Sequence, residues 1–310
     1  VTMPGHLVPK LAGVEGVFAV YDDSSGPKPV GALPGGPNSV KSGQIHGATD
    51  AWERGYNGSG VRVAVADSGI DFAHPDLNGT QAILEDPNSP YDGWGIMHDP
   101  ISLVRWQRDG LAYPSATDSW WVETTNIDND SNNDSILDAQ GWNITGISAS
   151  MSGAYHFGLH SDSKLIQRSG GDVIILVVDT KISGVYDTVY IDIDRDGDFG
   201  DESPVNKANP TYGRDTNQDG LWDQSAGLLW WISDGINGVP YGDIYAARNG
   251  YQNRVANSGD LILMMLNDAS EAGGNHGTLC ASAVAAQGVV NNGAVLGMAP
   301  GADLIAVSNL

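Results

Sequence analysis

Residues 61–71 read VRVAVADSGID, a short apolar run that ends in two carboxylates. The branched and small residues from Val61 to Ala66 predict a buried strand, and Asp67-Ser68-Gly69 predicts a turn at its end. In open α/β sheets functional groups collect beyond the carboxyl ends of the strands, so Asp67 stands where a catalytic residue would lie. On this segment alone, an Asp that closes a turn fits equally well.

A second segment, residues 273–281, reads GGNHGTLCA and leads into an Ala-rich helix predicted over 277–287. Small residues on its first turns allow this helix to run through a crowded interior, with His276 at its start. A buried strand is predicted over 303–308. With the strand at 61–66, these elements predict a parallel α/β unit. A lone His at a helix start is also common as a structural residue.

The chain of 310 residues carries 38 acidic and 15 basic residues, a formal net charge of −23. This balance argues against binding to nucleic acid or to an anionic membrane, because both need Lys and Arg to neutralise phosphate. The single cysteine, Cys280, excludes an intrachain disulfide framework and cysteine-cluster metal sites. No transmembrane segment is predicted, and from the first residues we expect a part of a longer protein.

Three motifs occur in one order along the chain. They are DSG at 67–69 with HPDL at 74–77, HGTxxA at 276–281 and GMAPGA at 297–302. Together they resemble the subtilisin-like serine proteases (subtilases) over residues 44–80 and 273–310. The resemblance implies an α/β fold with a subtilisin-like parallel sheet, incomplete in this chain. It also implies an Asp-His-Ser triad to which this chain supplies Asp67 and His276.

A serine hydroxyl is a weak nucleophile until an imidazole accepts its proton, and a carboxylate on the far ring nitrogen fixes the imidazole tautomer. By resemblance, His276 is the general base and Asp67 its orienting partner. No Gly-Thr-Ser-x-Ala motif, the family's setting for the nucleophile, occurs in the 310 residues. We therefore expect the Ser to come from a C-terminal remainder of the catalytic domain, in the same precursor or in a separate chain.

Asp67 and His276 are 209 positions apart, which leaves room for a domain-sized insert. Strands are predicted at 147–159, 172–179, 188–194, 228–232 and 261–266. Large β-rich inserts at this place occur in pyrolysin-like and tripeptidyl-peptidase-like members of the family, and the segments at 190–204 and 231–235 resemble the pyrolysin-like group. We expect a propeptide remnant and linker at 1–43, catalytic-domain segments at 44–80 and 273–310, and a β-rich, calcium-binding insert at 81–272. Most of the nine Trp residues fall in this insert, and core packing is their expected role.

Carboxylates in the insert are grouped in three segments of similar spacing. The candidate metal ligands are Asp130, Asn132, Asp134 and Asp138; then Asp192, Asp194, Asp196, Asp198 and Asp201; then Asp215, Asn217, Asp219, Leu221 and Asp223. Oxygen ligands at positions 1, 3 and 5, a turn residue at 6 and a backbone carbonyl at 7 can surround Ca²⁺. No segment has Glu at position 12, so they resemble the shorter calcium loops of thrombospondin-type or dockerin-type repeats. Solvated, Asp-rich turns are the alternative.

Two further features follow from the resemblance. Asp76, with the loop at 291–295, matches a subtilase calcium site, although this loop is one residue short. Cys280, one helical turn after His276, occupies the place of the cysteine in thiol-sensitive, proteinase K-like members; a small buried hydrophobe without a role is the alternative. Asn-x-Ser/Thr triplets, typical of glycosylated exported proteins, begin at Asn57, Asn78, Asn129, Asn133 and Asn143.

The sequence thus predicts a secreted, calcium-stabilised serine endopeptidase that acts on polypeptide substrates outside the cell or at its surface. Two alternatives stay open. One is a catalytically inactive subtilase-like scaffold that uses its calcium-loaded insert for assembly or adhesion. The other is an exopeptidase in which the insert blocks one end of the cleft.

Overall fold

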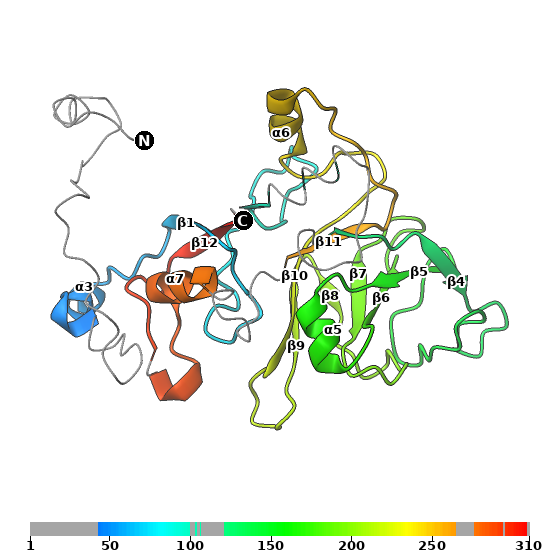
Figure 1. The fold of residues 1–310 in the computed structure, drawn as a ribbon, viewed down its shortest axis with the longest axis horizontal. Coiled ribbons are helices and arrows are strands. Elements are labelled where there is room, and N and C mark those ends of the chain that lie inside the picture. Colours follow the sequence, from blue (N-terminus) through cyan, green and yellow to red (C-terminus); the bar gives the residue numbers. More distant parts are fainter. Residues whose placement is uncertain are drawn as a thin grey trace. The chain divides into compact units, whose positions relative to one another are not determined.

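The structure is a computed structural model that describes residues 43–99, 103, 106, 121–264, 276–293 and 295–308 (Figure 1). The chain divides into two compact units, residues 1–38 and 39–310. The first unit, and with it nearly all of the predicted propeptide remnant and linker, lies outside the described residues. In the described part of the chain, no helix combines the length and the apolar character that a bilayer span requires.

A three-stranded parallel sheet joins the two segments that resemble the subtilase catalytic domain. Its strands stand in the order β1 (Arg62–Asp67), β12 (Asp303–Ser308) and β2 (Met97–His98). β1 and β12 pair in parallel over their whole length, as Figure 1 shows. The predicted α/β fold with a parallel sheet is confirmed, and both strands start within one residue of their predicted positions.

Two helices accompany this sheet. α3 (Ala48–Glu53) lies where the sequence is helical in pattern, and α7 (His276–Ala285) is the predicted Ala-rich helix. α7 contacts both β1 and β12, and a 3₁₀ turn, η2 (Val290–Gly293), follows it. The small residues on α7 therefore allow the helix to pack close to the sheet (Figure 1).

The chain between residues 121 and 264 contains two antiparallel sheets (Figure 1). The first has the order β4 (Asn126–Asn129), β5 (Ala154–Leu159), β6 (Ile174–Val178), β7 (Thr188–Asp192) and β8 (Val205–Asn206). The second has the order β3 (Trp121–Val122), β11 (Leu261–Met264), β10 (Gln224–Ile232) and β9 (Thr211–Arg214). Two helices, α5 (Ser163–Ser169) and α6 (Gly242–Asn249), lie between strands in the chain.

The strand predicted over 147–159 is correct only from Ala154 onward. Residues 147–153 form bends and irregular chain instead. The buried carboxylate of Asp179 accepts hydrogen bonds from the Ser150 hydroxyl and from the Ser152 N–H. Such bonds to side chains replace the ladder bonds of a strand, which explains why the alternating pattern does not produce one here.

The parallel sheet extends further along the chain than residue 80. β2 falls within residues 81–272, yet it pairs in parallel with β12, and Gln81 also bridges to Leu304. Met97 in β2 is almost fully buried, which accounts for this pairing. Residues 81–98 therefore contribute to the parallel sheet rather than to the antiparallel ones.

One hydrophobic cluster spans the parallel sheet and the antiparallel sheet that contains β10. It contains Phe72, Leu77 and Met97 from the first part and Trp230 and Trp231 from the second. The indole N–H of Trp230 also donates to the carbonyl of Gly95. Among the described tryptophans, Trp121, Trp230 and Trp231 are fully buried, as expected for core residues. The two parts thus share a core and are not joined by chain connections alone.

The fully buried side chain of His160 makes the folded state sensitive to acid. His160 accepts from the N–H of Asp162 at Nδ1, and its Nε2 lies 3.0 Å from the carbonyl of Ala226. This arrangement fits the neutral ring, because a proton on Nδ1 would face the N–H of Asp162. Burial lowers the pKa of His160 to about 4 from 6.5, against the opposing hydrogen bond to Ala226.

We expect His160 to cost stability as the pH falls from 6.5 to 4, because only the unfolded state takes up its proton in that range. The loss reaches about 3 kcal/mol below the folded pKa. The measurement is urea unfolding of the wild type and of His160→Phe at several pH values. As the pH falls, the free energy of unfolding of the wild type should decrease more than that of His160→Phe. A difference between the two free energies that does not change with pH would contradict this prediction.

Candidate active site

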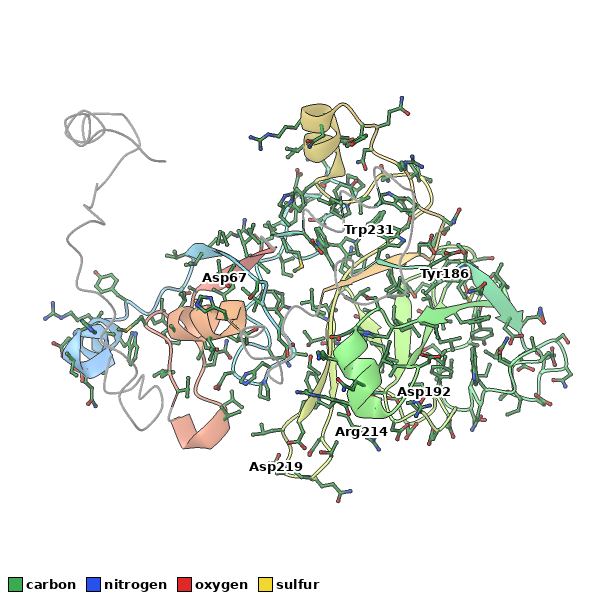
Figure 2. The ribbon with its side chains drawn as sticks, viewed as in Figure 1. Asp67, Tyr186, Asp192, Arg214, Asp219 and Trp231 are labelled. Carbon is green, nitrogen blue, oxygen red and sulfur yellow. The ribbon has the colours of Figure 1, made fainter. Side chains whose placement is uncertain are left out.

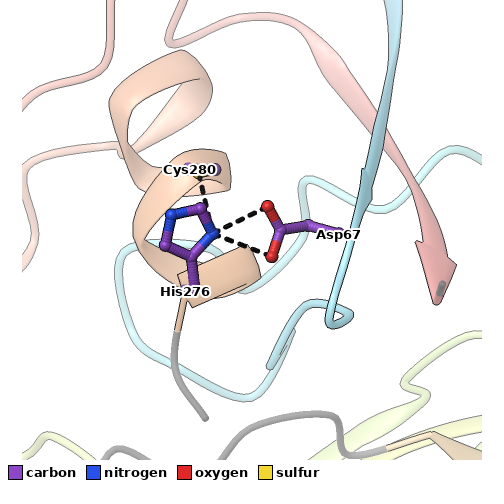
Figure 3. Close-up of side chains that lie close together, drawn as sticks. All are labelled: Asp67, His276 and Cys280. Atoms are coloured by element: carbon purple, nitrogen blue, oxygen red, sulfur yellow. Dashed lines mark hydrogen bonds and ion pairs between the residues drawn. The ribbon is translucent and has the colours of Figure 1, made fainter. Parts of the chain in front are cut away.

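The site is formed by Asp67, at the carboxyl end of β1, and His276, the first residue of α7. The Nδ1 atom of His276 lies 2.7 Å and 2.9 Å from the two carboxylate oxygens of Asp67. Figure 3 shows the carboxylate facing this nitrogen, while the second ring nitrogen points away from it. The side chain of His276 is 66% exposed and that of Asp67 21%, so the ring is open to a reaction partner.

Contacts between the turn after β1 and the start of α7 hold this pair in place. The N–H of Gly277 donates to the Ser68 hydroxyl. A Cβ atom on Gly277 would lie 2.1 Å from the carbonyl oxygen of Gly69, so only glycine allows the helix to approach this closely. The sequence DSG followed by HG therefore encodes a direct backbone contact between the segments that carry Asp67 and His276.

The electrostatics of Asp67 favour its ionised form. Burial raises the pKa of its carboxyl group, but hydrogen bonds from the N–H of Ser68, from His276 and from the Ser68 hydroxyl outweigh this, so the pKa is lowered overall. An ionised Asp67 accepts a hydrogen bond from the Nδ1–H of His276, which keeps that proton on Nδ1 and leaves Nε2 unprotonated in the neutral ring. The pair can thus accept a proton at Nε2 and stabilise the resulting imidazolium.

Cys280 lies beside this pair, as the helical spacing predicts. Its Sγ atom is 3.6 Å from Nδ1 of His276, and Figure 3 shows all three side chains together. Burial and the nearby Asp67 carboxylate raise the pKa of the thiol, which keeps it protonated. The thiol is therefore close enough for any bulky group on sulfur to disturb the imidazole.

We expect a mercurial to inhibit the whole protein through Cys280, because mercury on Sγ would displace the adjacent His276 ring. The Cys280→Ala variant should retain hydrolytic activity and resist the reagent. Initial rates with a peptide substrate, before and after the mercurial, measure both. A Cys280→Ala variant as sensitive as the wild type would contradict the prediction.

The three Asp-rich segments fold into loops with one hydrogen-bond pattern. Each starts where a strand ends: after β4, at the last residue of β7 and after β9. Positions are counted from the first Asp of each loop, which is Asp130, Asp192 or Asp215. In each loop the carboxylate at position 1 accepts hydrogen bonds from the N–H groups of positions 5 and 6. The carboxylate at position 5 accepts a hydrogen bond from the N–H of position 7. Positions 4 and 6 have positive φ in all three, at Asn133 and Ser135, Arg195 and Gly197, and Gln218 and Gly220.

In the second loop the carboxylates converge. Ligand oxygens of Asp192, Asp194 and Asp196 lie within 4.8 Å of one another. Oδ1 of Asp194 is buried and, among the described residues, has no hydrogen-bond partner, while Oδ2 lies 3.2 Å from the Arg214 guanidinium. Asp192 and Arg214 are labelled in Figure 2. The other two candidates, Asp198 and Asp201, are not part of this group of oxygens.

In the first and third loops the last carboxylate closes onto the start of the loop. Asp138 accepts from the N–H and hydroxyl of Ser131, and Asp223 accepts from those of Thr216. These hydrogen bonds hold the pKa of both carboxyl groups below the ordinary value. At position 3, the side-chain oxygens of Asn132 and Asn217 accept from the position-5 N–H. Asp219, at position 5 of the third loop, is labelled in Figure 2.

Asp76 lies beside the turn that follows α7. Its carboxylate accepts from the N–H groups of Val289 and Val290, and its carbonyl accepts from that of Gln287. The side chain is almost fully buried. The structure thus brings Asp76 next to the start of the loop that the resemblance pairs with it, while Ala294 of that loop lies outside the described residues.

Sequence reasoning missed one set of contacts around Asp67. Asp71 donates its N–H to the Thr278 hydroxyl, and its carboxylate accepts from the hydroxyl of Ser225 in β10. Thr278 stands within a recognised motif and Asp71 lies between two of them, but no pattern in the sequence marks Ser225. Its partner is 154 positions away, so only the folded chain reveals the contact.

Comparison of the sequence with known proteins identifies the family of this chain. The model of the subtilase family matches residues 58–309. Pyrolysin of Pyrococcus furiosus is 32% identical over 180 residues, covering 52% of this chain and 12% of pyrolysin. The minor extracellular protease Vpr of Bacillus subtilis is 37% identical over 83 residues, covering 24% of this chain and 10% of Vpr. Subtilisin E of Bacillus subtilis is 34% identical over 92 residues, covering 29% of this chain and 23% of subtilisin E.

No solved structure matches the chain. The chain spans 10%, 12% and 23% of the lengths of these three relatives. The family match nevertheless covers most of the 310 residues and contains Asp67, His276 and the segment between them. This chain belongs to the subtilase family.

Proposed function

We propose that the whole protein to which this chain belongs is a serine endopeptidase, and that His276 is the general base of its Asp-His-Ser triad and Asp67 the residue that orients it. The observation that carries the proposal is the position of both Asp67 oxygens within 3 Å of Nδ1 of His276. The nucleophilic Ser comes from another part of the whole protein, in the same precursor or in a separate chain.

The roles of the two residues follow from their contacts. Asp67 holds the proton on Nδ1, so Nε2 accepts the proton of the Ser hydroxyl as it attacks the peptide carbonyl. The same nitrogen then delivers this proton to the leaving amine, and a water molecule is activated in the same way for deacylation. Since Asp67 stays ionised throughout, it stabilises the imidazolium in both steps.

Calcium is the proposed stabilising cofactor of the three loops. The chemistry of the donor set supports this, because hard carboxylate and amide oxygens are what Ca²⁺ binds. The unpartnered Oδ1 of Asp194 supports it too, since a buried carboxylate oxygen needs a cation or a donor. We assign Asp192, Asp194 and Asp196 to one site. Asp130, Asn132, Asp134 and Asp138 form a second, and Asp215, Asn217, Asp219, Leu221 and Asp223 a third.

Two peripheral assignments complete this proposal. Asp198 and Asp201 lie outside the group of Asp192, Asp194 and Asp196 oxygens and support the second site indirectly. Asp76 binds a further calcium ion together with the loop after α7. Asp198 already accepts hydrogen bonds from Asn143 and Gly200, which fits a supporting role. Each of the four proposed sites binds a divalent cation through oxygen ligands.

The segments have separate roles in this proposal. Residues 44–80 and 273–310 belong to the catalytic domain, residues 1–43 are a propeptide remnant and linker, and the β-rich part within 81–272 is a calcium-binding insert. The similarity to Vpr, whose name describes it as extracellular, supports a place outside the cell or at its surface. The glycosylation triplets agree with export.

The test of endopeptidase activity is digestion of casein by the whole protein. Long internal fragments, seen by mass spectrometry, are the expected products. Release of single residues or of short terminal peptides alone would indicate an exopeptidase instead. Absence of any cleavage by folded, calcium-loaded protein would support the inactive scaffold, in which the insert serves assembly or adhesion.

A further inference from the structure

The β-rich part of the chain touches the catalytic turn directly, through Ser225. Ser225 is the second residue of β10, two positions after Asp223 of the third loop. Its hydroxyl donates to Oδ1 of Asp71 at 2.8 Å. Asp71 is four residues after Asp67, on the turn that carries the catalytic carboxylate. This hydrogen bond therefore links the antiparallel sheet to the end of β1.

The local structure of β10 directs the Ser225 hydroxyl toward Asp71. The pairing of β10 with β9 is irregular after Ser225, and Gly227 has a φ of 86°. The N–H of Gly227 donates to the Ser225 oxygen at 3.0 Å. Since the oxygen already accepts this bond, its single proton is available for Asp71. Irregular pairing of this kind commonly redirects a side chain next to a functional site.

Asp71 is tied in turn to the helix that carries His276. Its N–H donates to the Thr278 hydroxyl at 3.0 Å, and Thr278 is two residues after the catalytic base. Its Oδ1 also accepts from the N–H of Ala73, which fixes the carboxylate within the turn. Asp71 is 9% exposed, so its negative charge depends on protein donors rather than on water. Removal of the Ser225 donor therefore changes a buried charge between the two catalytic segments.

We propose that Ser225 is a positioning residue: through Asp71 it holds the turn after β1 against α7 and so maintains the alignment of Asp67 with His276. The proposal rests on the proposed function of this pair. Ser225 contacts neither of the two catalytic side chains in the described structure, so it acts through Asp71. In this proposal the β-rich insert contributes to the alignment of the catalytic pair, in addition to most of the length and much of the negative charge of the chain.

The test compares Ser225→Ala, Ser225→Thr and Ser233→Ala in the whole protein. Ser233 is the matched control, because it follows the other end of β10, accepts from the N–H of Gly235 and donates to Ala256, away from the catalytic segments. We expect Ser225→Ala to lower kcat about tenfold with KM unchanged, since small misalignments of a catalytic pair cost rate and not binding. Ser225→Thr keeps the hydroxyl and should restore most of the loss.

A spectroscopic measurement separates this proposal from the proposed function. Proton NMR of the whole protein, with ¹⁵N-labelled histidine, observes the Nδ1 proton of His276 shared with Asp67; a His276→Gln variant assigns it. We expect Ser225→Ala to shift or broaden this resonance, and Ser233→Ala to leave it unchanged. If the wild type proves inactive, the proposed function fails, and this resonance alone decides the role of Ser225. An unchanged resonance and kcat in Ser225→Ala, or equal losses in Ser233→Ala, would overturn the proposal.

Discussion

Replacement of His276 by Ala is expected to lower kcat/KM of the whole protein for peptide hydrolysis by at least about four orders of magnitude. The reason lies in the ring's position: Nδ1 faces the Asp67 carboxylate. In the proposed mechanism Nε2 is therefore the base that activates the nucleophile. Without the imidazole, the Ser hydroxyl attacks as a neutral, weak nucleophile. The measurement is steady-state hydrolysis of a chromogenic peptide.

Asp67→Asn tests the other half of the pair and keeps its size. The amide has one acceptor oxygen and one NH₂ donor, so it favours the wrong tautomer of His276, and we expect a fall of roughly the same order. His46→Ala is the matched control, because His46 is an exposed histidine outside the site. A His276→Ala protein that keeps more than about a hundredth of the wild-type rate would contradict the assigned roles.

The second large effect is expected on removal of the proposed calcium ions. Each site occupied at a hundredfold excess over its Kd stabilises the folded state by about 2.7 kcal/mol, so three loops contribute about 8 kcal/mol. For a unit of this size, 1 kcal/mol corresponds to roughly 2 °C in Tm. We therefore expect a chelator to lower Tm by about 15 °C, because crowded carboxylates such as Asp192, Asp194 and Asp196 repel one another without a cation.

The measurement is the Tm of the whole protein, determined by calorimetry in calcium and in EDTA. Addition of excess calcium to the EDTA sample should restore the original Tm. Asp215→Ala should reduce the part of the calcium-dependent Tm shift that the three loops contribute by about a third, since it disables one of them. Asp50→Ala, at an exposed carboxylate on α3, should leave that part unchanged. Identical Tm values in calcium and in chelator would exclude calcium as the stabilising cofactor.

The sequence predicts the parts of the site that have local patterns. Asp67 and His276 can be found because each sits in a short motif whose glycines record a close backbone contact, as at Gly277 against Gly69. The calcium template likewise predicts the turn at position 6 of each loop. It does not predict the left-handed residue at position 4, where Arg195 and Gln218 stand, because these side chains carry no preference for that backbone.

Long-range contacts lie beyond such reasoning. The sequence alone assigns β2 to the insert because two residues leave no strand pattern, and only its pairing with β12 places it in the parallel sheet. Ser225 escapes notice for a similar reason, since its role depends on an irregular pairing and on a partner 154 positions away. In both cases tertiary contacts override weak local signals.

The most direct test of the central claim is labelling of the whole protein by a fluorophosphonate, a reagent that reacts with a Ser activated by an adjacent base. We predict stoichiometric labelling of one Ser in the wild type and none in His276→Ala. Peptide mapping identifies the labelled residue and the chain that carries it. A folded wild-type protein that is not labelled, or a His276→Ala variant labelled equally fast, would contradict the claim that His276, oriented by Asp67, is the general base of a serine protease.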